Sequence, residues 1–370
     1  MKLLLRPHYT LHSEPPDASG EEAIVFVSEA RRVVVKGRNF REFVNRVVPL
    51  LNGTRSLDEI HSLVSDVFAS TDLEGALRLL SAQGIIEDAD SYAFDPVAVH
   101  RALPQISYLR ESHTDPVAAM DALARATVAI VGAGAVGVSA ALSLVASRVG
   151  KIRCLDPLPV EPSDCFLTQH YLQADVGRKR VEVLAERAAA LNPDCSVQTF
   201  TAPIEDDSDL ADFVSNADLA LGAADAGMVS LHYKLNRVCL ARGIPWSSAR
   251  ATAFEGVLGP TVFPGRTACF VCATMRSVAC HNDPQDALRH ARSLDRRHQD
   301  ESPTREGLAF GSGIMGRLLA HEAFQYLIGG ESALSGRLIV LDMQQMMTTH
   351  HRVLRVPDCP ACGVAAKAQR

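Results

Sequence analysis

The sequence has 370 residues, of which 47% are hydrophobic and 22% are charged, and its formal net charge is -6. A chain of this length exceeds what one hydrophobic core usually organises, so we expect two globular domains. The mildly acidic balance disfavours a nucleic-acid backbone or an anionic membrane as the main partner. The N-terminal leucines are followed at once by Arg6 and Pro7, unlike a secretory signal, and the apolar runs are too short for a membrane helix. We therefore expect a cytoplasmic protein.

The first 90 residues show strand patterns followed by helix patterns. Val, Ile and Phe cluster between turns rich in Pro, Gly and Asn, which predicts three strands at residues 6–13, 22–28 and 31–36. Three helices follow: one over residues 39–51, a second that begins after Ser56, and a third that starts near Thr71 or Asp72 and ends at Gly84.

Cap residues mark where two of these helices begin. Asn39 is predicted to cap the first helix, which should end at Asn52 and Gly53. Ser56, with Glu59 three residues later, is predicted to form a capping box for the second. The sequence therefore predicts a small α+β domain over residues 1–90.

Within this domain, the phrases LLNGTRSLDEI and LRLLSAQGIIED resemble the PqqD-like peptide-recognition domain of ribosomal-peptide maturation systems. The resemblance implies that residues 1–90 bind the leader of a precursor peptide. The same element order is typical of winged-helix DNA-binding domains. A winged helix usually has a basic recognition helix, whereas residues 72–83 carry two acids and one base. Peptide binding is therefore favoured over DNA binding.

A bound peptide could add as a strand beside residues 31–36, where backbone hydrogen bonds would supply affinity. Arg32 and Lys36 share one strand face by the two-residue period, so they could meet acidic leader residues. The alternative is a solvated basic face. The apolar side chains predicted to contact the peptide are Val34, Leu73, Leu77 and Leu80.

Residues 91–125 lose a clear period and contain Pro96, Pro104 and Pro116. This pattern predicts a linker with one amphipathic helix over about residues 116–123. The boundary between the two domains is expected there, with the second domain over residues 126–365.

A glycine loop opens the second domain. A buried strand pattern is followed by Gly132, Gly134 and Gly137 in GxGxxG spacing and then by an Ala-rich helix. Such glycines allow close backbone approach to phosphates, and Asp156 ends the next strand, where it could accept ribose hydroxyls. Two readings stay open on these residues alone, namely glycines that merely pack helix on sheet and an NAD-dependent dehydrogenase.

The continuation LDPLPVEPSDCFLTQHYLQADVGRKRVEVLAERAAALNP resembles the ThiF/MoeB family, and ADVGRKR followed by LNP is its most specific part. The segment ADLALGAADAGMVSLHYKLNRVCLARGIPWSSA matches that family's strand, aspartate and helix, which puts Asp225 at its metal and phosphate position. The resemblance covers about residues 120–365 and disfavours a dehydrogenase. It implies a Rossmann-type α/β nucleotide-binding fold with ATP and Mg²⁺ as possible ligands, and we also expect a homodimer.

The nucleotide site departs from active adenylating members of this family. Ala135 stands where those members have a second glycine of a Gly-Gly pair, and Asp164 and Leu167 stand where they carry an Asn and an Arg toward the triphosphate. The family lysine corresponds to Arg180 or, with a one-residue shift, to Lys179. A cation is therefore kept, but Arg and Lys differ in phosphate geometry. We expect weak ATP binding or none.

Four cysteines form two Cys-x-x-Cys pairs in turn contexts, FPGRTACFVC and VPDCPACG. Two such pairs can supply four thiolates to one zinc ion, with no coordination position left open for catalysis. A structural zinc site is therefore predicted, and disulfides are disfavoured in a reducing compartment. The predicted ligands are Cys269, Cys272, Cys359 and Cys362.

Cys280 and the segment 287–306 can each be interpreted as functional or as ordinary surface features. Cys280, beside His281, lies in a segment that carries a catalytic thiol in ubiquitin-activating relatives, but neighbouring residues need not face each other, so an unreactive thiol is favoured. Residues 287–306 are rich in Arg, His and acids, which predicts a crossover loop that gates the site, contacts a partner or simply faces solvent. His350 and His351 are expected at the surface.

Three segments together, DPLPVEPSD with DVGRKR, GVLGPTVFPGRTACFVC and VPDCPAC, most closely resemble the ThiF-like partner proteins of azoline-forming peptide cyclodehydratases. In those systems a separate YcaO enzyme uses the ATP. The resemblance implies a subunit for bacteriocin-type peptide biosynthesis that binds the precursor leader and presents the core to a YcaO partner. The alternative is a stand-alone ATP-dependent enzyme that activates carboxylates or amides of the bound peptide through Asp156, Arg180 and Asp225.

Overall fold

The structure is a computed structural model, and it divides the chain into two compact units, residues 1–119 and 120–370. This division falls inside the predicted linker, and the predicted domain limits stay predictions. The residues that the structure describes are 2–6, 8–15, 21–29, 31–91, 102, 104–110, 115–204, 206–223, 229–286, 288–289 and 307–363. Among these residues, none of the helices is both long and apolar enough to cross a membrane.

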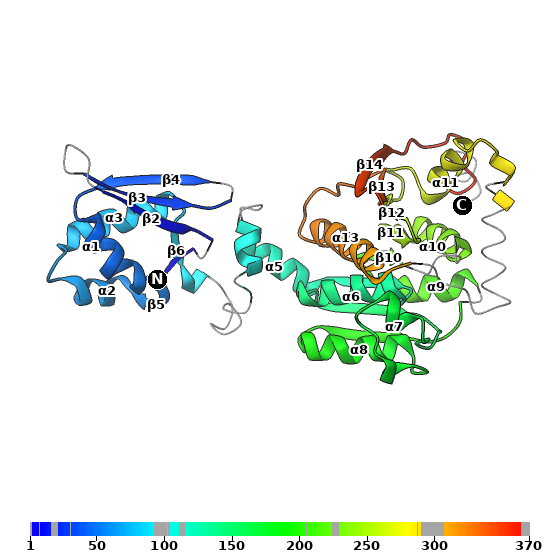
Figure 1. Ribbon diagram of the computed structural model, residues 1–370, viewed down its shortest axis with the longest axis horizontal. Helices are drawn as coiled ribbons and strands as arrows, with labels where there is room; N and C mark the ends of the chain where they lie inside the picture. Colours follow the sequence, from blue (N-terminus) through cyan, green and yellow to red (C-terminus); the bar gives the residue numbers. More distant parts are fainter. Residues whose placement is uncertain are drawn as a thin grey trace. The chain divides into compact units, whose positions relative to one another are not determined.

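Unit 1 is built from two three-stranded antiparallel sheets and short helices around one hydrophobic core. The sheets have the strand orders β2-β3-β4 and β5-β1-β6. The strands are β1 (Lys2–Leu5), β2 (Thr10–Glu14), β3 (Glu22–Val27), β4 (Arg32–Gly37), β5 (Asn52–Ser56) and β6 (Ile86–Asp88). The helices are α1 (Phe40–Glu42), η1 (Phe43–Val47), η2 (Val48–Leu50), α2 (Leu57–Val64), α3 (Ser70–Ala82) and η3 (Ala89–Ser91). Figure 1 shows α2 and α3 beneath the β2-β3-β4 sheet.

The predicted elements of unit 1 are confirmed in part. The second and third predicted strands and the Ser56–Glu59 capping box are present. Asn39 precedes the helix at Phe40 as predicted, but it has a φ of 59° and its side chain makes no cap hydrogen bond. The first strand begins at Thr10 rather than at residue 6. Strands β1, β5 and β6 were not predicted, because they form by pairing between distant segments, β1 with β5 and β1 with β6.

Part of the predicted linker is helical. Helix α5 (Pro116–Arg125) confirms the amphipathic helix predicted there, and residues 104–110 are helical as well. Arg110 forms an ion pair with the buried carboxylate of Glu87, which also accepts a hydrogen bond of 2.9 Å from Arg6 Nε. The segment 104–110 is therefore tied into unit 1 rather than being a free spacer.

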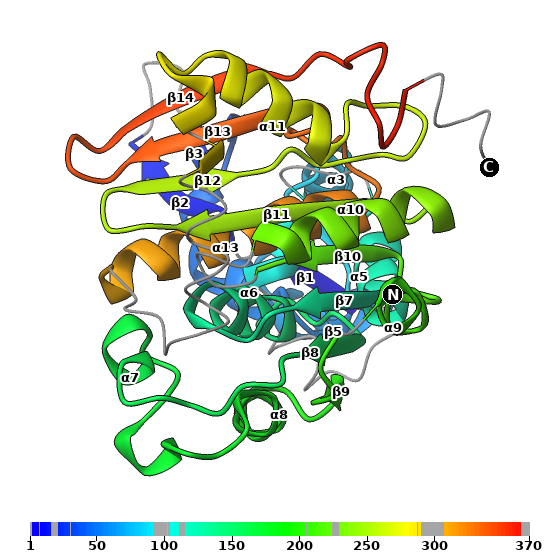
Figure 2. The same ribbon diagram turned by 90° about the vertical axis from the view of Figure 1, so that its right-hand side faces the viewer.

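Unit 2 has one eight-stranded sheet with helices on both faces. Its strand order is β14-β13-β12-β11-β10-β7-β8-β9 (Figure 2), with parallel pairing from β11 to β9 and antiparallel pairing from β11 to β14. The strands are β7 (Thr127–Val131), β8 (Lys151–Leu155), β9 (Ser196–Phe200), β10 (Leu219–Gly222), β11 (Trp246–Ala251), β12 (Glu255–Leu258), β13 (Arg337–Asp342) and β14 (Met347–Arg352). The predicted Rossmann-type α/β fold is confirmed.

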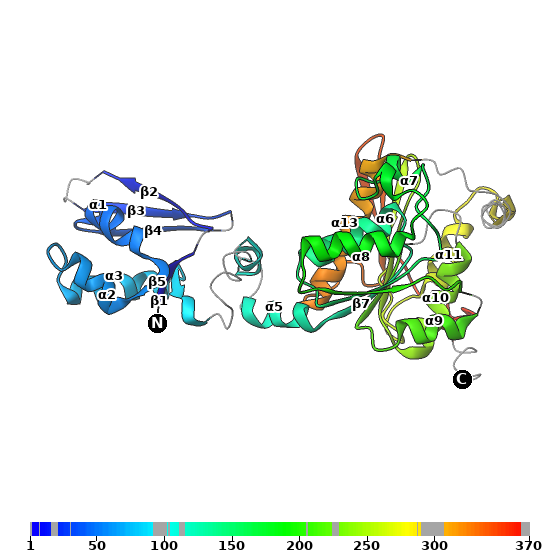
Figure 3. The ribbon, with the colours of Figure 1, turned by 90° about the horizontal axis from the view of Figure 1, so that it is seen from below.

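The helices of unit 2 form two layers, with α6, α8 and α13 on one face of the sheet and α9, α10 and α11 on the other (Figure 3). They are α6 (Ala135–Ala146), α7 (Asp164–Leu167), η4 (Gln173–Asp175), α8 (Arg180–Leu191), α9 (Asp207–Val214), α10 (Val229–Arg242), α11 (Phe270–Ala279) and α13 (Ala309–Leu327). Helices α6 and α13 approach closely at Gly316, where an added Cβ would lie 2.4 Å from the carbonyl oxygen of Val136. This packing fixes α6, the helix that follows the glycine loop.

Candidate functional site

The glycine loop connects β7 to α6 through a tight turn. Gly132 has a φ of 100°, a conformation that favours glycine, and its N–H donates to the carbonyl of Leu155 at 2.8 Å. Gly134 precedes the first residue of α6. A Cβ on Gly137 would lie 1.9 Å from the carbonyl oxygen of Gly132. Gly132 therefore permits the turn, and Gly137 permits the close packing of α6 against it.

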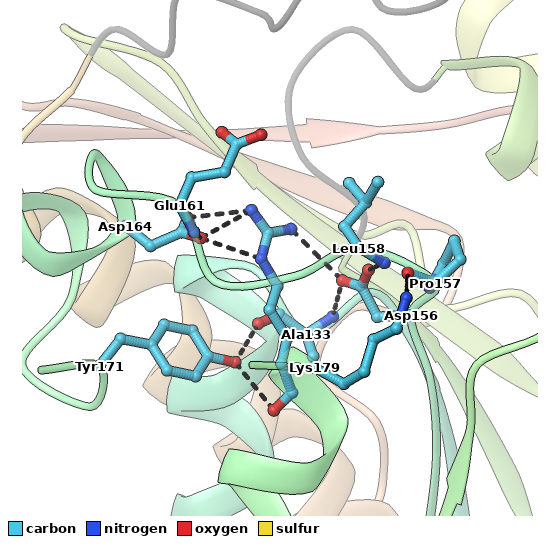
Figure 4. Close-up of polar contacts among 9 residues, drawn as sticks. Ala133, Asp156, Pro157, Leu158, Glu161, Asp164, Tyr171 and Lys179 are labelled. Atoms are coloured by element: carbon cyan, nitrogen blue, oxygen red, sulfur yellow. Dashed lines mark hydrogen bonds and ion pairs between the residues drawn. The ribbon is translucent and has the colours of Figure 1, made fainter. Parts of the chain in front are cut away.

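Asp156 follows β8 at the carboxyl edge of the sheet, as the sequence predicted. Its side chain is 5% exposed. One carboxylate oxygen accepts the N–H of Ala133 in the glycine loop at 2.8 Å, and the other accepts the N–H of Leu158 at 2.9 Å (Figure 4). The carboxylate that the resemblance assigns to ribose is therefore already bonded to the backbone of the loop.

Arg180 begins α8, and its side chain is fully buried. Its Nε donates to Asp164 Oδ2 at 3.0 Å, and its Nη2 lies 2.8 and 3.0 Å from the two Asp164 oxygens. Its Nη1 lies 3.5 Å from Asp156 Oδ2. Two nitrogens of the guanidinium thus donate to the Asp164 carboxylate. This bidentate geometry makes Arg–carboxylate pairs strong and directional.

The other residues near the loop are also held by protein groups. Lys179 Nζ donates to the carbonyl of Pro157 at 2.7 Å, and the Tyr171 hydroxyl donates to the carbonyl of Ala133 at 2.6 Å. Burial raises the pKa of Tyr171 well above its usual value, so this hydroxyl stays protonated. Leu167 is buried. The predicted residue Asp225 lies outside the described residues.

The paired charges of this site do not fit a nucleoside triphosphate. Two carboxylates, Asp156 and Asp164, contact the guanidinium of Arg180, so these three side chains together carry a net charge of about -1, with the ammonium of Lys179 nearby. A triphosphate would meet both carboxylates, and the arginine that could bind it is already paired inside the protein. The weak ATP binding expected from Ala135 and Leu167 stays a prediction.

The four predicted zinc ligands come together and are all buried. Their ligand atoms lie within 4.8 Å of one another, with Sγ distances of 3.9 Å for Cys269–Cys272, 3.7 Å for Cys269–Cys359 and 3.5 Å for Cys272–Cys362. A tetrahedral zinc with Zn–S bonds of about 2.3 Å puts its sulfurs about 3.8 Å apart. The cluster fits zinc, which would tie residues 359–362 to the start of α11.

Backbone and side-chain groups orient this cluster. Burial by itself raises the pKa of a thiol, but the N–H groups of Val356 and Cys269 hold the pKa of Cys272 below its usual value. The Oδ1 of the buried Asn236 accepts the N–H of Phe270, the residue after Cys269, at 3.0 Å. The role of Asn236 was not predicted, because an Asn inside a helix pattern does not indicate a distant hydrogen-bond partner.

The predicted peptide-contacting residues lie in two environments. Arg32, Val34 and Lys36 are exposed on β4, an edge strand, whereas their neighbours Val33 and Val35 are buried. Arg32 lies 3.5 Å from Glu14 on β2. The remaining three are core residues of α3, each less than 5% exposed: Leu73, Leu77 and Leu80. These leucines therefore pack within unit 1, and their contact with a peptide stays a prediction.

The remaining candidates lie at the surface wherever the structure describes them. Cys280 is exposed at the end of α11, and His281 beside it is exposed as well. His350 and His351 are exposed on β14, as expected. Of the predicted crossover loop 287–306, only residues 288–289 lie within the described residues.

Unit 2 thus combines an α/β sheet with helices on both faces, a glycine loop after its first strand and a buried four-cysteine cluster that could hold a metal ion. The match to the ThiF family model covers residues 108–361. The chain therefore belongs to the ThiF family.

Curated relatives of the chain are activating enzymes. The SAMP-activating enzyme E1 of Haloferax volcanii is 30% identical over 236 residues, which are 64% of this chain and 80% of that protein. The molybdopterin-synthase adenylyltransferase of Escherichia coli is 26% identical over 243 residues, 66% of this chain and 89% of that protein. These relatives match about two thirds of the chain.

Solved structures of similar fold match almost the whole chain. The E. coli protein MccB, solved with ATP, has a TM-score of 0.66 and 19% identity and covers 98% of this chain and 100% of its own. The microcin C7 biosynthetic enzyme MccB, solved with N-formylated MccA, has a TM-score of 0.68 and 18% identity at the same coverage. PaaA has a TM-score of 0.66 and 19% identity and covers 94% of this chain.

Proposed function

We propose that this protein is the recognition component of a system that matures a ribosomally made peptide. Unit 1 binds the leader of the precursor, and the chain presents the core of that peptide to a partner enzyme of the YcaO type, which performs an azoline-type cyclodehydration with its own ATP. The chain itself turns over no ATP. A homodimer remains our expectation, and light scattering of the purified protein checks it.

The observation that carries this proposal is the pair formed by Arg180 and Asp164. Both side chains are essentially inaccessible to solvent. Breaking a buried ion pair of this kind costs about 3 to 5 kcal/mol, because it leaves an uncompensated charge in the protein interior. A triphosphate that recruited Arg180 would have to offset this cost and would also bring its own charge close to Asp164. The pair therefore favours a family member that has kept the fold without the activation chemistry.

Edge strand β4 supports the peptide-binding part of the proposal. Because β4 ends the β2-β3-β4 sheet, its outer backbone groups can pair with an added strand. Arg32 and Lys36 project from its exposed face, so a leader with acidic residues would match it in charge. The microcin C7 biosynthetic enzyme MccB, which is similar in fold, has been solved in complex with N-formylated MccA.

A second candidate is an ATP-dependent enzyme that activates a carboxylate or amide of the bound peptide. Family membership favours it, since the curated relatives are activating enzymes and MccB has been solved with ATP. The preserved glycine turn and Asp156 favour it as well.

One experiment separates the two candidates. The purified chain is titrated with Mg-ATP, and AMP and ADP are then measured after adding the precursor peptide with and without the partner enzyme. The recognition role predicts no ATP binding in the micromolar range and nucleotide turnover only with the partner. Release of AMP or ADP by this chain and the precursor alone would establish the enzyme instead.

The peptide-binding face is tested with charge reversals in the full chain. Arg32→Glu combined with Lys36→Glu should weaken leader binding by roughly tenfold, since each exposed charge contributes about 0.5 to 1 kcal/mol and reversal adds repulsion. Arg55→Glu on the β5-β1-β6 sheet is the matched control and should leave leader affinity unchanged. Equal effects of both changes would refute β4 as the binding edge, and specific binding of duplex DNA would refute the peptide interpretation.

A further inference from the structure

Asp164 is the residue that pairs most closely with the guanidinium of Arg180. It sits at the first residue of α7, above the start of α8, and its Oδ2 accepts both the N–H of Glu161 at 2.8 Å and the guanidinium of Arg180. A backbone N–H therefore helps to hold this carboxylate in place beside the arginine. Arg180 in turn links Asp164 to Asp156 and, through it, to the N–H of Ala133 in the glycine loop. The paired arginine therefore lies next to the loop that would hold phosphates.

The described cations near the loop are engaged by the protein itself. Lys179 donates to the carbonyl of Pro157, and Arg180 contacts two carboxylates. Its Nε and Nη2 both donate to Asp164, so this edge of the guanidinium cannot make a bidentate contact to phosphate while the pair is formed. The glycine turn, however, has a left-handed Gly132 and a closely packed Gly137, as a phosphate-binding loop requires. The glycine turn is therefore kept, but the two carboxylates beside it disfavour an anionic ligand.

We propose that Asp164 is a specificity-determining residue that excludes nucleoside triphosphates from a site that keeps its glycine turn. The ligand class that it excludes is the polyphosphate chain, not the nucleoside. This inference rests on the proposed function, because it explains why the chain would bind no ATP. It goes further in assigning most of the exclusion to one carboxylate, so that removing this charge should raise the affinity for Mg-ATP even though Ala135 and Leu167 are unchanged.

The test compares Mg-ATP, inorganic tripolyphosphate and AMP as ligands of the full chain by isothermal titration calorimetry. Asp164→Asn keeps the size of the side chain and can still accept the N–H of Glu161, but it removes the negative charge. We expect Mg-ATP and tripolyphosphate to bind Asp164→Asn at least ~10-fold more tightly than the unchanged chain, with little change for AMP. Adding Arg180→Met to Asp164→Asn should abolish the gain.

Asp175→Asn is the matched control. Asp175 is also buried, accepts the N–H of Leu172 at 2.9 Å and pairs with Arg187 at 2.8 Å, but its partners lie outside the glycine loop. It should give no gain in ATP affinity. An equal gain in this control would show a general charge effect and would overturn the inference. Zinc content and thermal melting verify that each variant is folded, and Asp164→Ser replaces Asp164→Asn if that variant is not.

The outcomes for the inference and for the proposed function differ. If a folded Asp164→Asn chain binds ATP no better than the unchanged chain, and neither binds it tightly, Asp164 is not the excluding residue, while the recognition role stands. If the unchanged chain already binds ATP tightly and releases AMP or ADP with the precursor alone, the proposed function fails together with the inference.

Discussion

The four-cysteine cluster and the glycine-loop site lie in the same unit, and both keep the spacing of a functional motif. The cluster brings four like donors to one point, with Sγ atoms of Cys272 and Cys362 3.5 Å apart. The glycine-loop site keeps its turn, but its arginine forms an ion pair with Asp164. A metal site forms when its donor atoms are in place, whereas an anion site also needs cations that are not already paired with carboxylates of the protein. One added carboxylate can therefore prevent anion binding without changing the sequence motif of the site.

The largest effect should come from removing the metal. We expect one zinc per chain, and stripping it with a chelator should unfold the region around α11 and the C-terminal cysteines. On the order of 10 kcal/mol of binding free energy is coupled to folding in structural zinc sites. Elemental analysis and thermal melting measure this, and Cys359→Ser should lower both the zinc content and the melting temperature.

Cys239 provides the control for that prediction. It is fully buried on α10 but is not part of the cluster. Cys239→Ala should keep the zinc and lose about 1 kcal/mol from the missing sulfur. A fully stable, zinc-free chain would show that the cluster is not a structural metal site.

The next largest effect concerns the ion pair. Asp164→Ala and Arg180→Met should each destabilise the fold by about 3 to 5 kcal/mol, because each leaves a buried partner uncompensated. The double variant should cost much less than the sum, since it removes both charges together. Chemical denaturation of the four chains measures the coupling. Additive losses would mean that the two side chains do not stabilise each other.

Gly137→Ala should cost about 3 kcal/mol, because its Cβ would lie 1.9 Å from the carbonyl oxygen of Gly132 and would push α6 away from the turn. Gly313→Ala in α13 is the matched control. An added Cβ there meets nothing within 4 Å, so it should stabilise the fold by about 0.5 to 1 kcal/mol. Both values come from denaturation curves, and a tolerated Gly137→Ala would contradict the close approach of helix and turn.

The smallest effect is expected for Lys179→Met. Its Nζ donates to a backbone carbonyl at the edge of the site, so its loss should change stability by about 1 kcal/mol or less. It should leave nucleotide affinity unchanged. Added to Asp164→Asn, Lys179→Met should leave the raised affinity for Mg-ATP unchanged, and a measurable loss there would instead make Lys179 a phosphate ligand.

The sequence by itself determined the features that depend on local spacing. Two Cys-x-x-Cys turns each aim two thiols at one point, and three glycines in fixed spacing build a turn before a helix, so both were predictable from neighbouring residues. The Ser56–Glu59 capping box was predictable for the same reason, since its partners are three residues apart. The fold family follows from the longer ThiF-like segments around these motifs.

Only the tertiary structure decided which charges meet. Asp164 and Arg180 are 16 residues apart, and the family resemblance placed both at the nucleotide site but did not show that they pair with each other. Likewise, Arg110 was part of a predicted linker, yet it pairs with Glu87 in unit 1. The physical reason is that a side chain's charge is local, whereas its partner and its burial are set by how distant segments pack. Whether a charged residue binds a ligand or its own protein is therefore fixed only in the folded chain.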